Sequence, residues 1–209
     1  MRPDSVADHP LSVSEYIAWE EGNTVKHEYV AGEVYAMTGV SARHNLIMLN
    51  LAMALRGRTR GRGCRVFATD VKLRASSDRY YYPDLMVACG SAGEIALIVS
   101  EPSLVVEVTS PSTRGTDRRE KLEAYMKMPS LRAYLIVDQR RRHVLMYTRR
   151  GAADWTREEV SGNDELSLSF LNTTLSLDEI YEDITLPPLA VGEDVDPDEW
   201  GDEEELDDF

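Results

Sequence analysis

Two short apolar runs, each with one acidic residue, constrain the fold of this chain more than any other feature. Asp84 directly precedes Leu-Met-Val-Ala-Cys, a run that is short enough for a strand and too short for a typical helix. Glu107 interrupts the β-branched run 104–108, where a buried strand normally carries another apolar side chain. Because an unpaired carboxylate is costly to bury, we expect the two carboxylates to share a divalent cation, which accepts several oxygen ligands and cancels their repulsion.

A helix is predicted over residues 116–127, directly after the second run. Asp117, Lys121 and Tyr125 are four residues apart and therefore share one face of this helix, so the lysine can reach toward the strand carboxylates. Two carboxylates, a metal and a lysine are the parts that metal-assisted phosphodiester hydrolysis needs. The metal orients the phosphate and lowers the pKa of the attacking water, while the lysine positions that water or stabilises charge on phosphorus.

Several motifs follow one another in a fixed order along the chain. They are His27 to Met37, His44, Tyr82-Pro83-Asp84, Leu104 to Arg114, Asp117, Lys121, Tyr125, and Ala133 to Asp138. With this ordered set, the chain resembles the Uma-type family of restriction-endonuclease-like proteins, within the PD-(D/E)xK nuclease superfamily, over residues 11–185. In the Glu-x-Lys form of that superfamily the lysine follows the glutamate by two positions. Here that position is Thr109, and Lys121 looks like a migrated lysine.

The resemblance implies a metal-dependent endonuclease that hydrolyses DNA phosphodiester bonds with Mg²⁺ or Mn²⁺. The residues that it implies for catalysis are Asp84, Glu107, Lys121 and His44, and those for the metal are Asp84, Glu107 and Val108. A non-catalytic module that keeps the nuclease fold for DNA or protein contact is the alternative. A buried ionic network without activity is a third interpretation, since such networks also shift pKa values.

Other titratable residues carry more than one interpretation. His44 lies near the start of a predicted helix, where it could approach the metal or serve as a capping or partly buried residue. Asp70 could add a carboxylate, or pair with Lys72 or Arg74 in a hairpin. The weaker carboxylate candidates are Glu28 and Glu33.

Arginines cluster just after the helix predicted over residues 41–56, where they alternate with glycines. This pattern predicts a flexible cationic loop suited to phosphate contact. The macrodipole of a helix C-terminus also favours arginine, so an ordinary surface role stays open. The predicted nucleic-acid contacts are Arg56, Arg58, Arg60, Arg62, Arg114 and Arg118. The basic run 140–142 is predicted to be a charged hairpin turn.

The net charge of −14 is concentrated at the end of the chain. Residues 193–208 include 11 acidic residues and no Lys or Arg, whereas residues 1–192 carry 26 acidic against 23 basic residues. We expect one domain over residues 1–190 and an acidic disordered tail over residues 191–209. The tail either improves solubility or mimics DNA and competes for the basic surface.

The predicted fold is α+β (α/β), with a restriction-endonuclease-like mixed central β-sheet flanked by helices. The expected order is a short helix capped by Ser12, a hairpin (28–38), a helix (41–56), strands (64–74, 80–88 and 103–108), a helix (116–127), strands (132–138 and 143–149) and a last helix capped by Ser176.

Cys64 and Cys89 are expected to be buried free thiols rather than a disulfide. No apolar run approaches the roughly 18 residues that a membrane span needs, so we expect a cytoplasmic protein without a membrane partner. A homodimer is compatible with cutting both strands of a duplex.

Overall fold

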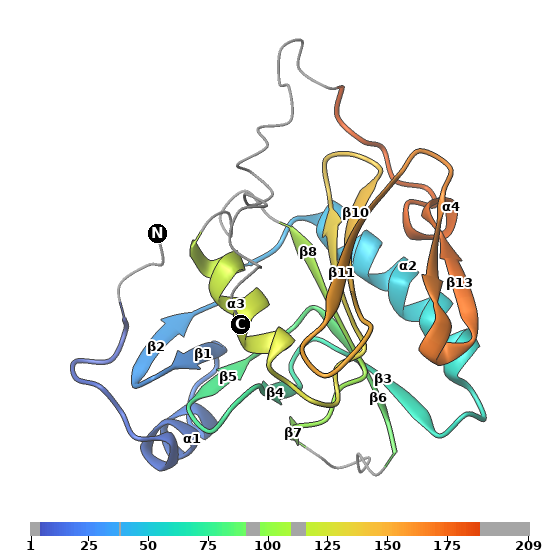
Figure 1. The fold of residues 1–209 in the computed structure, drawn as a ribbon. Helices are drawn as coiled ribbons and strands as arrows, with labels where there is room; N and C mark the ends of the chain where they lie inside the picture. The colour runs from blue at the N-terminus through green and yellow to red at the C-terminus, as the bar shows by residue number, and fades with distance from the viewer. Residues whose placement is uncertain (1–4, 38, 91–96, 110–115, 189–209) are drawn as a thin grey trace.

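The computed structural model describes residues 5–37, 39–90, 97–109 and 116–188, with only the backbone described for residues 116–118 (Figure 1). The predicted acidic tail, residues 191–209, therefore lies outside the described residues. The α+β class is confirmed. The α-helices are α1 (Val13–Glu21), α2 (Ala42–Thr59), α3 (Thr116–Met126) and α4 (Leu177–Ile180).

The central sheet has the strand order β11-β10-β9-β8-β6-β3. Its members are β3 (Cys64–Ala68), β6 (Leu85–Cys89), β8 (Leu104–Thr109), β9 (Ala133–Asp138), β10 (His143–Arg149) and β11 (Trp155–Ser161). The pair β8 and β9 is parallel and the other neighbours are antiparallel, so the sheet is mixed, as predicted. Helix α3 lies between β8 and β9 in the chain and forms the crossover that a parallel pair requires.

A second sheet, with the order β2-β1-β5-β4-β7, packs beside the central one. Its members are β1 (His27–Val30), β2 (Glu33–Ala36), β4 (Lys72–Arg74), β5 (Arg79–Tyr81) and β7 (Ile98–Val99). A hairpin of β12 (Glu165–Leu168) and β13 (Thr173–Ser176), joined by the 3₁₀ turn η2 (Ser169–Leu171), covers α2 and precedes α4.

The single strand predicted over residues 64–74 is wrong. It divides into β3 of the central sheet and β4 of the second sheet. The break comes at Thr69 and Asp70, whose φ angles of 45° and 48° are left-handed and cannot continue a strand. Strands β3 and β4 therefore do not pair with each other as a hairpin. Lys72, at the start of β4, lies over the ring of Tyr16 at 4.5 Å.

The two faces of the central sheet have separate cores. Helices α2 and α4 and the β12–β13 hairpin cover one face, and α3 and the second sheet cover the other (Figure 1). The buried side chains between these layers form one cluster on each face. Alternation along β8 shows the division, since Val106 and Val108 belong to the first core and Val105 to the second. Glu107 consequently faces the α3 side, among apolar and tyrosine side chains.

The predicted capping boxes are confirmed at α1 and α4. Ser12 and Glu15 exchange hydrogen bonds at the start of α1, and Ser176 and Glu179 do so at the start of α4. None of the described helices combines the length and apolar character needed to cross a membrane.

The prediction of two buried free thiols is wrong. Cys64 and Cys89 form a disulfide. Cys64 is half-buried and Cys89 is exposed. The register of β3 and β6 places them opposite each other, with their Cα atoms 3.9 Å apart. The sequence shows that both cysteines are present, but their pairing depends on the register of β3 and β6, which the sequence alone does not specify.

Candidate active site

Asp84 lies at the entrance of β6, as its position after Pro83 predicts. Its Oδ2 accepts a hydrogen bond from the backbone N–H of Val108 at 2.7 Å and lies 3.2 Å from Nε2 of His44. Both contacts use the same carboxylate oxygen. Asp84 therefore connects the entrance of β6 to the end of β8 while its Oδ1 stays outside these contacts.

His44 is buried at the start of α2, where its backbone N–H donates to Oγ of Ser41 at 3.2 Å. Its Nε2 faces two acceptors, the carbonyl of Val108 at 3.0 Å and the carboxylate of Asp84, so Nε2 carries the proton. Burial lowers the pKa of His44, but the hydrogen bond and charge of Asp84 and the Val108 carbonyl raise it by more. His44 is therefore a buried residue near the start of α2, as one interpretation predicts, and it contacts Asp84.

Glu107 lies in β8, and its side chain is only 17% exposed. Its Oε1 accepts a hydrogen bond from the Tyr125 hydroxyl at 3.0 Å and lies 3.3 Å from Nζ of Lys121. Burial raises the pKa of Glu107, Lys121 lowers it, and the charges of Asp84 and Glu28 raise it, with a net value of about 7. These contacts leave Oε2 for a further ligand.

Lys121 lies on α3, and the structure brings its ammonium to Glu107 as the face shared with Tyr125 predicts. A second carboxylate is closer, since Oε1 of Glu28 lies 2.7 Å from Nζ of Lys121. Glu28 comes from β1 and is 7% exposed. Sequence reasoning ranked Glu28 among the weaker candidates. The signal that could have raised its rank is an acidic residue inside a predicted strand, the same signal that singled out Glu107.

A family model described as "Putative restriction endonuclease", and named Uma2, matches residues 13–179. The chain belongs to the Uma2 family. Two uncharacterised proteins of Synechocystis are relatives: slr1290 is 33% identical over 82% of this chain and 91% of its own length, and sll1609 is 35% identical over 77% and 94%. The resemblance noted from the ordered motifs is therefore confirmed.

A solved structure shares the fold of this Uma2 chain. It is the crystal structure of "a putative nuclease belonging to DUF820" from Anabaena variabilis, which superimposes with a TM-score of 0.69. The match covers 82% of this chain and 98% of that chain at 17% sequence identity, and at this identity it establishes the fold alone.

A hydrated divalent cation would suit the two carboxylates of this candidate site better than a closed cage of protein ligands would. Across the described ranges, no three His, Cys, Asp or Glu side chains are grouped so that they could hold a metal ion. Mg²⁺ does not require such a group, since it keeps several waters and commonly binds through one or two carboxylates. Asp84 and Glu107 each have one oxygen outside the contacts described above, whereas the Val108 carbonyl already accepts from His44.

The arginines predicted to contact nucleic acid divide into two kinds. Helix α2 continues to Thr59, so Arg56 and Arg58 belong to its last turn and not to a flexible loop. Arg58 donates to Glu179 at 2.7 Å and to the Thr174 carbonyl at 2.8 Å. Arg62 donates to the carbonyl of Leu171. Arg58 and Arg62 therefore hold the C-terminal hairpin and α4 against α2.

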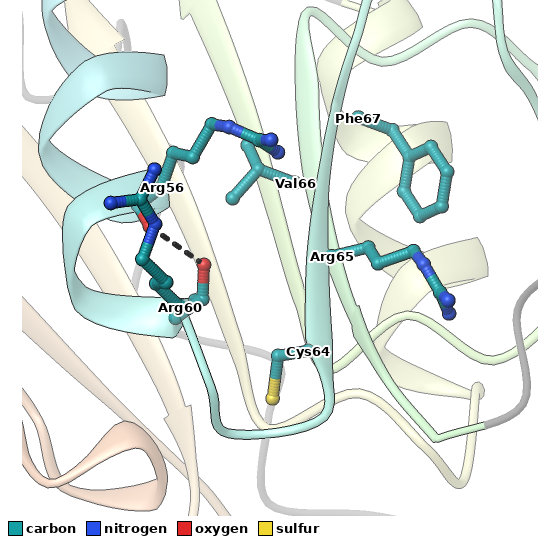
Figure 2. Close-up of a pocket in the computed structure, with 7 residues that line it drawn as sticks. Arg56, Arg60, Cys64, Arg65, Val66 and Phe67 are labelled. Atoms are coloured by element: carbon teal, nitrogen blue, oxygen red, sulfur yellow. Dashed lines mark hydrogen bonds between the residues drawn. The ribbon is translucent and has the colours of Figure 1, made fainter. Parts of the chain in front are cut away.

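Arg56 and Arg60, in contrast, are exposed. With Arg65 they line a hollow of about 420 Å³ where the end of α2 meets the edge strand β3. Figure 2 shows Arg56 and Arg60 on the helix side of the strand and Arg65 on its other side. Arg114 lies outside the described residues, as does the side chain of Arg118. The predicted turn at residues 140–142 is confirmed between β9 and β10.

Proposed function

We propose that this Uma2 protein is a Mg²⁺- or Mn²⁺-dependent endodeoxyribonuclease that hydrolyses DNA phosphodiester bonds. One observation carries the proposal: two largely buried carboxylates, Asp84 and Glu107, meet at adjacent ends of β6 and β8 with the ammonium of Lys121 beside them. Three charged groups that converge in this way, with the pKa of one carboxyl raised to about 7, are typical of a reaction centre.

In the proposed reaction, Asp84 and Glu107 would hold the cation. The Val108 carbonyl, which has a second lone pair beside its hydrogen bond from His44, would be a third candidate ligand. A bound cation orients the phosphate and lowers the pKa of its water. Lys121 donates hydrogen bonds to carboxylates here, so we assign it the role of a cation that stabilises charge on the phosphate. His44 orients Asp84 through Nε2.

DNA contact is proposed for Arg56 and Arg60, which are exposed on the same side of β3. Phosphate contacts account for most of the affinity of a protein for DNA, and arginine forms them with its planar fork of donors. Arg58 is left out of this surface because it holds Glu179. A homodimer would present one such site to each strand of a duplex, which suits cleavage of both strands.

A non-catalytic binding module is the second candidate, and one observation favours it. The ammonium of Lys121 already lies between Glu28 and Glu107 and offsets one of their two negative charges without a metal. The two candidates differ in metal affinity. A nuclease binds Mg²⁺ or Mn²⁺ through Asp84 and Glu107, whereas a binding module has no need of either ion.

The test is cleavage of plasmid, linear and single-stranded DNA with Mg²⁺, with Mn²⁺ and with a chelator. We expect cleavage by the natural protein that is lost in the chelator and in Glu107→Ala. Glu158→Gln is the matched control, because it removes one carboxylate from an exposed position on β11. Full cleavage by folded Glu107→Ala would exclude this site, and no cleavage together with no metal binding by calorimetry would leave the binding module.

A further inference from the structure

We infer that Glu28 is the positioning residue of Lys121, a role that rests on the proposed nuclease function. The contact of Lys121 with Glu28 is 2.7 Å, and the contact with Glu107 is 3.3 Å. The Lys121 and Glu28 side chains are 12% and 9% exposed, so water screens this pair little. The lysine is therefore held mainly by a strand of the second sheet, and less by the strand that carries Glu107.

The migrated position of the lysine explains why it needs such a partner. A lysine two residues after Glu107 would be placed by the strand itself, but Thr109 stands there. Lys121 instead extends from α3 on a flexible four-carbon stem, which has many conformations. A fixed carboxylate selects one of them. Glu28 does this without occupying the Glu107 carboxylate, which the proposed metal requires.

Glu28 is itself held firmly. Its backbone is part of the β1–β2 ladder, where it is the partner of Tyr35, and the next residue, Tyr29, is the partner of Tyr80 on β5. The carboxylate also accepts from the backbone N–H of Tyr82 at 3.4 Å. Since Tyr82 lies two residues before Asp84, one carboxylate touches both the segment that carries Asp84 and the helix that carries Lys121.

The buried pair has a structural alternative, in which it only fastens α3 to the second sheet. That role predicts lost stability and unchanged chemistry. A third role, as a metal ligand, predicts lost metal affinity. The positioning role differs from both: it predicts a slower chemical step, an unchanged affinity for Mg²⁺ and DNA, and no effect once Lys121 is absent.

The experiment is a double-mutant cycle with Glu28→Gln, Lys121→Ala and the double variant, with Glu158→Gln as the charge-matched control. We expect Glu28→Gln to lower kcat by about 10–100-fold, with KM and Mg²⁺ affinity unchanged. The double variant should be no slower than Lys121→Ala. Glu28→Asp, which keeps the charge, should recover part of the rate.

Each contrary result has a definite meaning. Full activity of Glu28→Gln, or a loss that adds to that of Lys121→Ala, would overturn the positioning role. Weaker Mg²⁺ binding by Glu28→Gln would make Glu28 a ligand instead. If Lys121→Ala cleaves like the natural protein, the proposed role of Lys121 fails first, and with it the role of Glu28.

A readout that needs no cleavage keeps the two proposals separate. An ammonium held by a buried carboxylate exchanges its protons slowly, and its ¹⁵N-edited NMR signal can be assigned by its loss in Lys121→Ala. We expect this signal to broaden or vanish in Glu28→Gln and to persist in Glu107→Gln. An unchanged signal in Glu28→Gln overturns the inference whether or not the natural protein cuts DNA.

Discussion

The carboxylate of Asp84 takes the place of a strand partner for Val108. The last backbone pair of β6 and β8 is Leu85 with Val106, and two residues farther along β8 the N–H of Val108 donates to Oδ2 of Asp84 at 2.7 Å. This side-chain contact extends the ladder past the end of β6. It also fixes Asp84 next to Glu107, whose neighbour in the chain is Val108.

The two roles of Asp84 can be separated by substitution. Asp84→Asn keeps an oxygen acceptor for Val108 and removes the charge, whereas Asp84→Ala removes both. We expect both variants to lose metal-dependent cleavage, and Asp84→Ala to be less stable than Asp84→Asn by about 1–2 kcal/mol because a buried donor loses its partner. Urea unfolding in the presence of a chelator measures the difference. Equal stabilities would show that the Val108 hydrogen bond contributes nothing.

Glu107 should make the metal-free protein less stable as pH rises. Its pKa in the folded protein is about 7 against an ordinary value of 4.5, so the folded state binds more protons than the unfolded state between these two pH values. The contribution of Glu107 to stability therefore falls from pH 4.5 to 7. The Glu107→Gln variant has no group that titrates at this position. Its free energy of unfolding at pH 8 should therefore be higher than that of the natural protein by about 1–3 kcal/mol.

Urea unfolding of both proteins at pH 5 and pH 8 in a chelator tests this difference, which should be small at pH 5. Saturating Mg²⁺ should reverse the order, because it stabilises only the protein that keeps its carboxylate. A gap that is independent of pH would contradict the raised pKa of Glu107.

His44 should act on the reaction through Asp84. His44→Ala removes the Nε2–H donor from the Asp84 carboxylate. Loss of a residue that hydrogen-bonds to a metal ligand typically lowers metal affinity or activity by about 10–100-fold. We expect a loss of that size in the Mg²⁺ affinity measured by calorimetry. His44→Gln, whose side-chain amide can still donate, should lose less. Unchanged Mg²⁺ affinity in His44→Ala would limit His44 to packing.

The arginines should separate stability from DNA affinity. Arg56→Ala with Arg60→Ala removes two exposed guanidinium groups and should weaken DNA binding and flatten its salt dependence, with little effect on unfolding. Arg58→Ala should do the reverse and cost about 1–2 kcal/mol, since Glu179 and the Thr174 carbonyl lose their donor. Fluorescence anisotropy at several salt concentrations and urea unfolding measure the two effects. If Arg58→Ala weakened DNA binding as much as the double variant of Arg56 and Arg60 does, the separate roles of these arginines would be contradicted.

The sequence predicted those parts of the fold that depend on local patterns. An acidic residue inside an apolar run marked Glu107, and the spacing of Lys121 and Tyr125 marked the face of α3 that meets it. The capping boxes at Ser12 and Ser176 were equally local. Such features need no knowledge of which strands pair, so they could be found from the residues alone.

Features that depend on strand register escaped prediction. The contact between Glu28 and Lys121 requires β1 to lie in a second sheet beside α3, and no local pattern specifies that position. The strand predicted over residues 64–74 failed for a related reason. Apolar and polar residues alternate on both sides of the break, and the left-handed residues there, Thr69 and Asp70, do not mark a break as strongly as glycine does.

The disulfide between Cys64 and Cys89 should stabilise the segment that carries Asp84. It closes a loop with a sequence separation of 25 that contains β4, β5 and Asp84, and disulfides of this kind typically contribute about 2–4 kcal/mol. We expect reduction to lower the urea midpoint and to leave the initial rate of cleavage unchanged in native buffer, because neither cysteine touches the carboxylates. The double variant Cys64→Ser with Cys89→Ser should match the reduced protein. Thiol titration in denaturant without reductant should find no reactive thiol, and two reactive thiols would show that the pair is not bonded in solution.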